Sequence, residues 1–103
     1  MDFYTLIEKA RKTGKVDKGV NEVTKAVERG TAKAVFVAAD VSPKEIVAHL
    51  PVLCKEKGIL FVEVDSKQKL GISAGIAVGT AAVAVTSAGE ADKDIAQLKG
   101  KAA

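Results

Sequence analysis

Aromatic residues and cysteines are scarce in this chain of 103 residues. It has no Trp, one Tyr and three Phe, which disfavours a recognition surface of stacked rings and leaves the core to Val, Ile, Leu and Ala. The only cysteine is Cys54, so an intramolecular disulfide and a cysteine cluster for zinc are both excluded. A lone Cys within an apolar run is usually buried, and it fits a reducing, cytosolic compartment.

Signals for export or membrane insertion are also missing. The N-terminal residues do not show the basic-then-apolar order of a signal peptide. One long stretch of low charge, Leu70 to Val85, has glycines at intervals of four, as paired membrane helices do. It is short for a membrane span, and Ser73 and Thr80 interrupt it. We therefore expect a cytoplasmic protein without a membrane partner.

The chain does contain enough apolar residues for a folded core, since 48 % of them are hydrophobic. Its length predicts a single domain, residues 1–103. Sixteen basic and 13 acidic side chains give a net charge of +3. This balance is compatible with a polyanionic partner but does not require one.

Apolar runs of helical and extended periodicity alternate along the chain. They predict helices over residues 2–13, 20–29, 43–57, 66–73 and 90–100, and short buried strands over residues 33–39, 59–64 and 81–86. Residues 75–80 are expected to form a loop. The helix over residues 66–73 can be capped by Asp65 with Gln68, or by Ser66 alone. Strands that alternate with helices predict an α/β fold, with a mostly parallel sheet between two helix layers.

The third predicted helix has the clearest start and an internal break. Ser42 can cap it, Pro43 suits the first helical position, and Glu45 stands three residues after Ser42. Pro51 should kink or break this helix, because proline has no amide hydrogen to donate. Gly58 should end it, since glycine accepts the left-handed conformation found at helix ends.

Residues that could perform catalysis are few. His49 is the only histidine, and no pairing of it with a serine or cysteine suggests a nucleophile. Asp40 follows a predicted buried strand, where α/β enzymes place catalytic acids, but Asp is more often a turn former there. The glycine-rich residues 70–80 lack both the Lys-Ser/Thr end of a P-loop and the spacing of a dinucleotide motif. We expect no enzyme, no metal and no cofactor.

The helix that begins after Gly19 has two interpretations. In the simpler one, Asn21 caps the helix, and Glu22 and Lys25 are solvated residues that suit its two ends. In the other, the unpaired amides after Lys18 and Gly19 form a positive helix end, beside which Asn21, Glu22 and Lys25 supply donors and acceptors. Because Asn and Glu can contact base edges and Lys can hold phosphate, this set suits a nucleic acid with exposed bases.

Four runs of residues together resemble the archaeal ribosomal protein L7Ae family, within the L7Ae/L30e superfamily. They are GVNEVTKAVERG at 19–30, AAD at 38–40, IVAHLPVLC at 46–54 and SKQKLG at 66–71. The resemblance covers about residues 10–86. It implies a three-layer α/β/α sandwich around a mixed, mostly parallel four-stranded sheet, whose fourth strand would lie near Lys15 to Lys18.

The resemblance also implies a non-catalytic protein that binds kink-turn RNA, a sharply bent internal loop with tandem sheared G·A pairs. Members of the family serve in the large ribosomal subunit, and in archaea they also nucleate box C/D and box H/ACA guide particles and join ribonuclease P. The implied partners are kink-turn RNA and the subunits of these particles, with a monomer when free. Two alternatives remain: a scaffold subunit that has lost RNA affinity, and a small nucleotide-binding enzyme that uses Asp40 and residues 75–80.

Matched by position, the family's RNA-contacting residues around this helix correspond to Lys18, Gly19, Asn21, Glu22, Lys25 and Arg29. The resemblance implies that Asn21 and Glu22 address the G·A pairs. Lys18 and Lys25 would contact the flanking bases or the backbone, and Arg29 would steer phosphate.

A second implied contact is the apolar loop before the last strand, where Ile76, Ala77 and Val78 would pack on a flipped-out base. This loop departs from the family's pattern, since many relatives carry a polar or acidic residue at the position of Ala77 and a proline at that of Gly79. Glycine increases the freedom of the unbound loop, so ordering it on RNA costs more. We therefore expect a lower affinity or an altered preference among kink-turn types.

Overall fold

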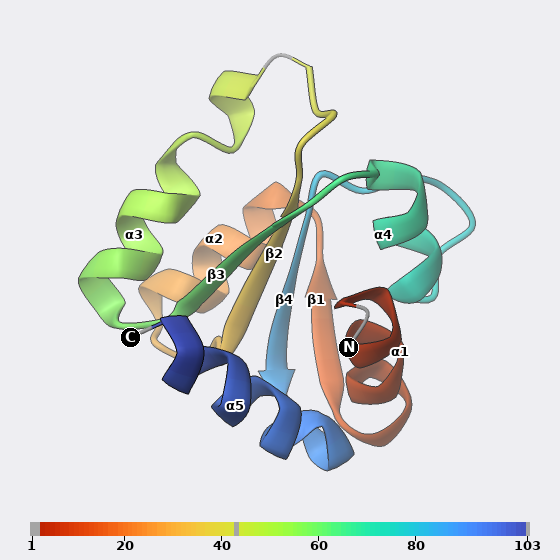
Figure 1. The fold of residues 1–103 in the computed structure, drawn as a ribbon. Coiled ribbons are helices and arrows are strands. Elements are labelled where there is room, and N and C mark those ends of the chain that lie inside the picture. The colour runs from red at the N-terminus through yellow and green to blue at the C-terminus, as the bar shows by residue number, and fades with distance from the viewer. Residues whose placement is uncertain (1–2, 43, 103) are drawn as a thin grey trace.

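Helices pack against both faces of one four-stranded sheet (Figure 1). The computed structural model describes residues 3–42 and 44–102. In chain order the elements are α1 (Phe3–Thr13), β1 (Lys15–Lys18), α2 (Val20–Glu28), β2 (Ala34–Ala38), the 3-10 turn η1 (Lys44–Ile46), α3 (His49–Lys57), β3 (Leu60–Val64), α4 (Lys67–Ser73), β4 (Ala82–Ser87), the 3-10 turn η2 (Gly89–Ala91) and α5 (Asp92–Ala102). The predicted α/β sandwich is confirmed. No helix among these residues is both long and apolar enough to cross a lipid bilayer.

The strands lie in the order β1-β4-β2-β3. Strand β2 pairs in parallel with β3, whereas β4 pairs antiparallel with both β1 and β2. The fourth strand implied near Lys15 to Lys18 is present as β1. The sheet is mixed, as expected, but the expectation of a mostly parallel sheet is wrong, because only the β2–β3 pairing is parallel.

Strand β4 runs against its neighbours because the chain turns back before β4 begins. After α4, residues 74–81 return along the helix, and the Thr80 amide donates to the carbonyl of Lys67, the first residue of α4 (3.1 Å). Because this segment runs the length of α4 in the opposite direction, the chain returns to the edge of the sheet where β3 ends, and β4 starts there. A helix alone would have carried the chain to the opposite edge and produced a parallel strand.

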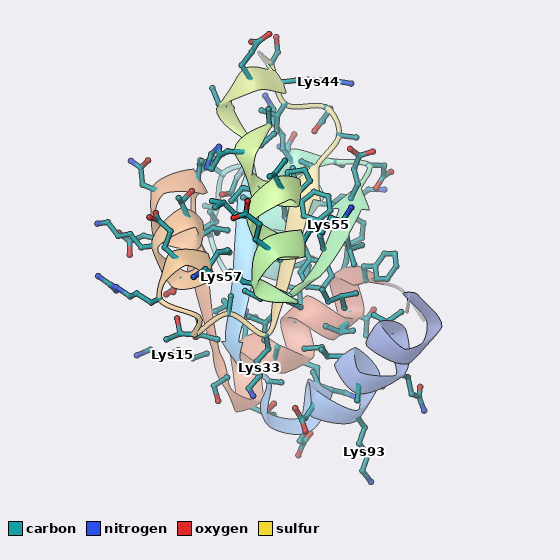
Figure 2. The ribbon with its side chains drawn as sticks, turned by 90° about the vertical axis from the view of Figure 1, so that its left-hand side faces the viewer. Lys15, Lys33, Lys44, Lys55, Lys57 and Lys93 are labelled. Atoms are coloured by element: carbon teal, nitrogen blue, oxygen red, sulfur yellow. The ribbon has the colours of Figure 1, made fainter. Side chains whose placement is uncertain are left out.

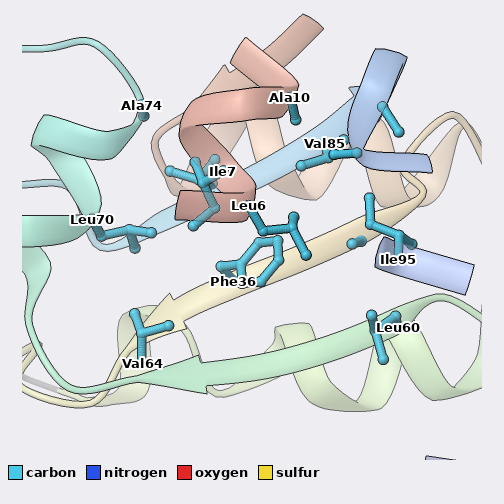
Figure 3. Packing of buried hydrophobic residues seen from close by; sticks show 14 of the residues in the cluster. Leu6, Ile7, Ala10, Phe36, Leu60, Val64, Leu70, Ala74, Val85 and Ile95 are labelled. Carbon is cyan, nitrogen blue, oxygen red and sulfur yellow. The ribbon is translucent and has the colours of Figure 1, made fainter. Parts of the chain in front are cut away.

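The two central strands are buried on both faces. All five residues of β2 are buried, as predicted for this run. Phe36 points toward α1, α4 and α5 and lies in one cluster with Leu6 and Ile7 (Figure 3). Val35 points to the other face, where Leu50 of α3 and the apolar side of α2 cover the sheet. Complete burial of a side chain such as Phe36 stabilises the fold by about 1.5–3 kcal/mol.

Strand β3 lies at the edge of the sheet and is only partly covered. Leu60 and Val64 are buried, Phe61 is half-buried, and Glu63 is exposed. The strand predicted over residues 59–64 is present, but its predicted burial is only partly confirmed. A charged side chain on an edge strand also disfavours pairing with another chain.

The predicted third helix is split into two parts. Residues 44–46 form the 3-10 turn η1, and the α-helix begins only at His49, so Ser42 does not cap it. Pro51 is the third residue of α3, where an amide has no partner within the helix, and the predicted break is therefore confirmed. Pro43 lies outside the described residues. Gly58 ends α3 with φ +68°, as predicted.

Ser66, rather than Asp65, caps α4. The Ser66 hydroxyl oxygen accepts a hydrogen bond from the Lys69 amide (3.2 Å). The Asp65 carboxylate instead accepts from the Tyr4 hydroxyl, and the Tyr4 oxygen accepts from the Ser66 amide (3.1 Å). The bond from Tyr4 lowers the pKa of Asp65, whereas burial and this same bond raise the pKa of Tyr4. The junction of β3 and α4 is thus tied to α1.

The two serines that the sequence offers as caps give the first test of this fold. We expect Ser66→Ala to lower the free energy of unfolding by about 1 kcal/mol, because the first turn of α4 loses its side-chain acceptor. Ser42→Ala is the matched control and should change it by less than about 0.5 kcal/mol, since Ser42 is exposed and has no hydrogen-bond partner among the described residues. Urea unfolding measures both, and equal effects would contradict the capping assignment.

Candidate nucleic-acid interface

The first turn of α2 is attached directly to the start of β4. Gly19 has φ +93° and ψ 149°, which side chains rarely allow, so the turn from β1 into α2 requires glycine. Its amide donates to the Ala82 carbonyl (2.9 Å), and its own carbonyl accepts the first helical bond from Val23 (2.9 Å). The position of this helix end relative to the sheet is therefore fixed by backbone bonds.

No side chain caps this helix end. Gly19 is the N-cap residue and has no side-chain oxygen, so the amides of Val20, Asn21 and Glu22 have no acceptor among the described residues. Unpaired amides at a helix start carry the positive end of the helix dipole. The end of α2 is thus open to an electron-rich partner.

The polar side chains of this turn contribute little to folding. Asn21 is exposed and has no hydrogen-bond partner within the described chain, so the interpretation of Asn21 as the helix cap is wrong. Glu22 and Lys25 form an ion pair of 3.6 Å, with more than half of each side chain exposed. Such a pair is worth about 0.3–0.5 kcal/mol. The stability of the fold therefore does not account for this trio.

Lys18 and Arg29 stand at different ends of the helix. Lys18 is exposed at the end of β1, opposite Val83 of β4 and next to the start of α2. Arg29 is the C-cap residue of α2. At 1.5 Å per residue, its backbone lies about 12 Å along the helix axis from that of Asn21. Arg29 is thus separate from the cluster of the first turn.

The predicted apolar loop extends from the far end of α4 to the start of β4. Ile76 is half-buried, Ala77 and Gly79 are exposed, and Val78 is 67 % exposed. Val78 is the most exposed large hydrophobic side chain among the described residues. An apolar side chain held in solvent in this way is available to a partner.

Backbone contacts with α4 hold this loop. The Ile76 amide donates to the Gly71 carbonyl (3.0 Å), and the Thr80 amide closes the loop on Lys67. Between these bonds the Val78 carbonyl lies against Gly71, and a Cβ atom at Gly71 would stand 2.0 Å from the Val78 oxygen. The loop therefore depends on the absence of a side chain at position 71.

One carbonyl joins the polar and apolar parts of the predicted site. The Ala82 oxygen accepts from the Gly19 amide (2.9 Å) and from the buried Thr80 hydroxyl (3.2 Å). Gly19 begins the polar turn, and Thr80 ends the apolar loop. Both parts consequently lie at the same edge of the sheet, the upper edge in Figure 1.

A groove beside α2 contains residues that the sequence did not indicate. It measures about 630 Å³ and lies between α2, η1 and the start of α3, with Asn21 and Lys25 on one wall and Ile46 and His49 on the other. His49 Nε2 and the Thr24 hydroxyl oxygen, 2.8 Å apart, join the two helices. This contact gives His49 a structural role. The groove could not be predicted, because residue spacing along the chain does not show that α2 and η1 are neighbours.

Lys67, at the start of α4, is a further residue beside the candidate site that the sequence did not indicate. Its amide donates to the Asp40 carboxylate (2.8 Å), its carbonyl accepts from Thr80, and its side chain is exposed. Asp40 is therefore a brace between β2 and α4, in agreement with a structural role for this residue. Lys67 forms no ion pair among the described residues. Its backbone bonds to Asp40 and Thr80 therefore hold an unpaired cation between the end of β2 and the loop before β4.

A family model, two ribosomal proteins and a solved structure are similar to this chain. The model of the family described as "Ribosomal protein L7Ae/L30e/S12e/Gadd45 family" matches residues 1–95. The "Large ribosomal subunit protein eL8" of Haloquadratum walsbyi is 53 % identical over 100 residues, covering 97 % of this chain and 83 % of the relative. That of Halobacterium salinarum is 56 % identical over 95 residues, covering 92 % and 79 %. The solved "Giardia lamblia 15.5kD RNA binding protein" superposes with a TM-score of 0.87 at 33 % identity, covering 96 % and 82 %.

The contact between Gly71 and Val78 predicts that Gly71→Ala disturbs the loop. The added methyl group would overlap a backbone carbonyl, so we expect a net loss of about 1–2 kcal/mol of stability, although alanine favours the helix itself. Hydrogen exchange at the Ile76 and Thr80 amides should accelerate more than exchange in β2, because the loop opens before the core does.

Gly14→Ala is the matched control for this measurement. A Cβ atom at Gly14 would stand 2.0 Å from the Ser87 carbonyl oxygen, an equally close backbone contact between the connection that follows α1 and the end of β4. We expect a similar loss of stability without selective acceleration at Ile76 and Thr80. If both variants change the exchange of these amides to the same extent, Gly71 does not position the loop.

Proposed function

Because the chain belongs to the ribosomal protein L7Ae/L30e/S12e/Gadd45 family, we propose that it is a non-catalytic RNA-binding protein of the ribosome that recognises kink-turn RNA. The relatives named above are large ribosomal subunit proteins, and the superposed structure is an RNA-binding protein. The same chemistry would serve the archaeal guide RNAs and ribonuclease P. The working compartment is the cytoplasm.

The observation that carries this proposal is the double hydrogen bond to the Ala82 carbonyl. Through it, a polar turn with unpaired amides and an apolar loop lie at one edge of the sheet. A kink-turn presents both matching surfaces, since its bend exposes the edges of G·A pairs and turns one base outward. A straight duplex would offer phosphates but no unstacked base for the loop.

Asn21 and Glu22 are the residues that we assign to the G·A pairs. Asn21 offers an amide donor and an acceptor, and Glu22 accepts from exocyclic amino groups. Both are exposed at the open end of α2. Lys18, Lys25 and the positive end of the helix would hold the crowded phosphates of the bend. Arg29 would attract phosphate from the far end of α2.

Ile76 and Val78 are assigned to the base that leaves the stack, with Ala77 between them. Glycine at position 79 leaves the free loop more mobile than proline would, but the bonds to Lys67 and Gly71 limit that freedom. The cost of ordering the loop on RNA is therefore reduced. Lys67, next to the loop, would supply a cation for the phosphate of the flipped nucleotide.

The proposed mechanism is a population shift. Free kink-turn RNA samples extended and bent forms, and a protein that contacts only the bent form moves the equilibrium toward it. The shift equals the difference in binding free energy between the two forms. No bond is made or broken, and no cofactor takes part.

Substitution of the two base-contacting residues tests the proposal. We expect Asn21→Ala and Glu22→Ala each to weaken binding to a kink-turn RNA by about 5- to 150-fold, because a specific base contact is worth about 1–3 kcal/mol. Stability should change by less than about 0.5 kcal/mol, since neither side chain supports the fold. Isothermal titration and thermal unfolding measure the two quantities.

Glu56→Ala is the control for charge. Glu56 is an exposed helical glutamate of α3 without an ion pair among the described residues, so its removal changes the net charge as Glu22→Ala does. Loss of a negative charge alone should leave RNA binding unchanged or slightly tighter. The proposal fails if Glu22→Ala behaves like Glu56→Ala, or if the wild-type protein does not prefer a kink-turn to a straight duplex.

A further inference from the structure

A second group of cations lies at the opposite edge of the sheet from the proposed kink-turn site. Lys15 is the first residue of β1, and Lys33 immediately precedes β2. Lys57 ends α3, just before β3. All three are exposed. Figure 2 shows Lys33 and Lys57 near the end of the sheet at which α3 ends, with Lys15 and Lys93 to either side.

The backbone fixes the arrangement of these lysines. Lys15 pairs with Ser87 at the end of β4, and the Lys33 amide donates to the Val85 carbonyl (2.7 Å). Because β4 separates β1 from β2, the two lysines start about 10 Å apart. Lys33 and Lys57 line one cleft of about 430 Å³, which the first turns of α5 close on the remaining side. The row therefore follows the edge of the sheet.

These lysines are not neutralised within the protein. No carboxylate among the described residues lies within 4.0 Å of the Nζ atom of Lys15, Lys33 or Lys57. The one acidic residue that lines the cleft is Asp92, in the first turn of α5. Two lysines of the cleft, Lys33 and Lys57, thus share it with one carboxylate, and Lys15 adds a third cation to the same edge of the sheet.

The ends of neighbouring helices explain only part of this charge. Lysines are favoured at helix C-termini because they offset the negative end of the dipole, and Lys57 stands at such a position. Lys15 stands two residues after the end of α1, where the same effect applies, whereas Lys33 directly precedes β2 and belongs to no helix. Three lysines without an ion pair at one edge suit an anion outside the chain.

We propose that this edge, defined by Lys15, Lys33 and Lys57, is a second RNA-binding surface that holds the phosphates of a double-stranded segment. The backbone amides around the cleft are engaged, since those of Thr31, Lys33 and Ile59 donate to carbonyls of the chain. Recognition would therefore depend on lysine ammonium groups alone. Such point charges bind a phosphate backbone without reading its sequence.

The pattern favours RNA over an acidic protein. A protein interface needs an apolar centre, whereas the large hydrophobic side chains exposed among the described residues lie elsewhere, in η1, α3, α4 and the loop before β4. A row of about 10 Å spans about three phosphates of one strand of a duplex. Strand β2 separates the two edges by about 17 Å, so the second segment is distinct from the kink-turn.

A two-RNA experiment tests this surface. The protein is first saturated with a kink-turn RNA, and a labelled RNA duplex of about 20 base pairs without internal loops is then titrated. We expect a ternary complex with the wild type. The triple variant Lys15→Gln, Lys33→Gln, Lys57→Gln should bind the duplex at least about tenfold more weakly, with a salt slope smaller by about 2.7, or about 0.9 for each lost phosphate contact.

The matched control is Lys44→Gln, Lys55→Gln, Lys69→Gln, which removes the same charge from exposed lysines of η1, α3 and α4. This variant should retain duplex binding, and the first triple variant should retain its affinity for the kink-turn. Equal losses of duplex binding in both triple variants overturn the proposal, as does equally tight binding of polyglutamate. If the wild type does not bind the kink-turn RNA, the proposed function is refuted. Titration of the free protein with the duplex still tests the second surface in that case.

Discussion

The reversed direction of β4 is the constraint on which the candidate interface depends. Strands β1, β2 and β3 run in the same direction, so their carboxyl ends, and the start of α2, all lie at one edge of the sheet. A fourth parallel strand would begin at the other edge, and the loop before it would lie far from Asn21. Because β4 is antiparallel and inserted between β1 and β2, its preceding loop meets the first turn of α2. The bonds to Ala82 follow from this topology.

Local patterns predicted most of the elements and failed where distant segments decide the outcome. The buried strand β2 and the stops at Gly30 and Gly58 follow from short runs of sequence, because burial and left-handed glycine are local signals. The helix expected from Ser42 begins instead at His49, where Pro51 can occupy the first turn. The direction of β4 depends on the Lys67–Thr80 bond, which no periodicity reveals. The family resemblance indicated both parts of the candidate site, the polar turn at the start of α2 and the apolar loop before β4. Lys67 and the groove at Ile46 could be recognised only in the folded structure.

Folding and the proposed recognition draw on different residues. The core consists of two clusters on either side of the sheet, and it contains none of the polar residues at the start of α2. Asn21 and Glu22 project from a helix end that backbone bonds and glycine already fix. The backbone of the candidate interface is therefore already ordered in the free protein, so binding at this site would cost little backbone entropy. Gly71 has the corresponding role for the apolar loop, since it lets the loop backbone rest on α4.

The two edges of the sheet acquire positive character for different physical reasons. At the upper edge, the uncapped start of α2 contributes unpaired amides, and its partial charge attracts electron-rich groups at close range. At the lower edge, α1, α2 and α3 end, and their carbonyl groups make the backbone locally negative. Only full side-chain charges can reverse that sign, and Lys15, Lys33 and Lys57 provide them. Close-range amides suit the fixed geometry of a bent internal loop, whereas flexible ammonium groups suit any phosphate backbone. The two proposed surfaces would thereby separate shape-specific from purely electrostatic recognition, and the length of the sheet would keep them from competing for the same segment of RNA.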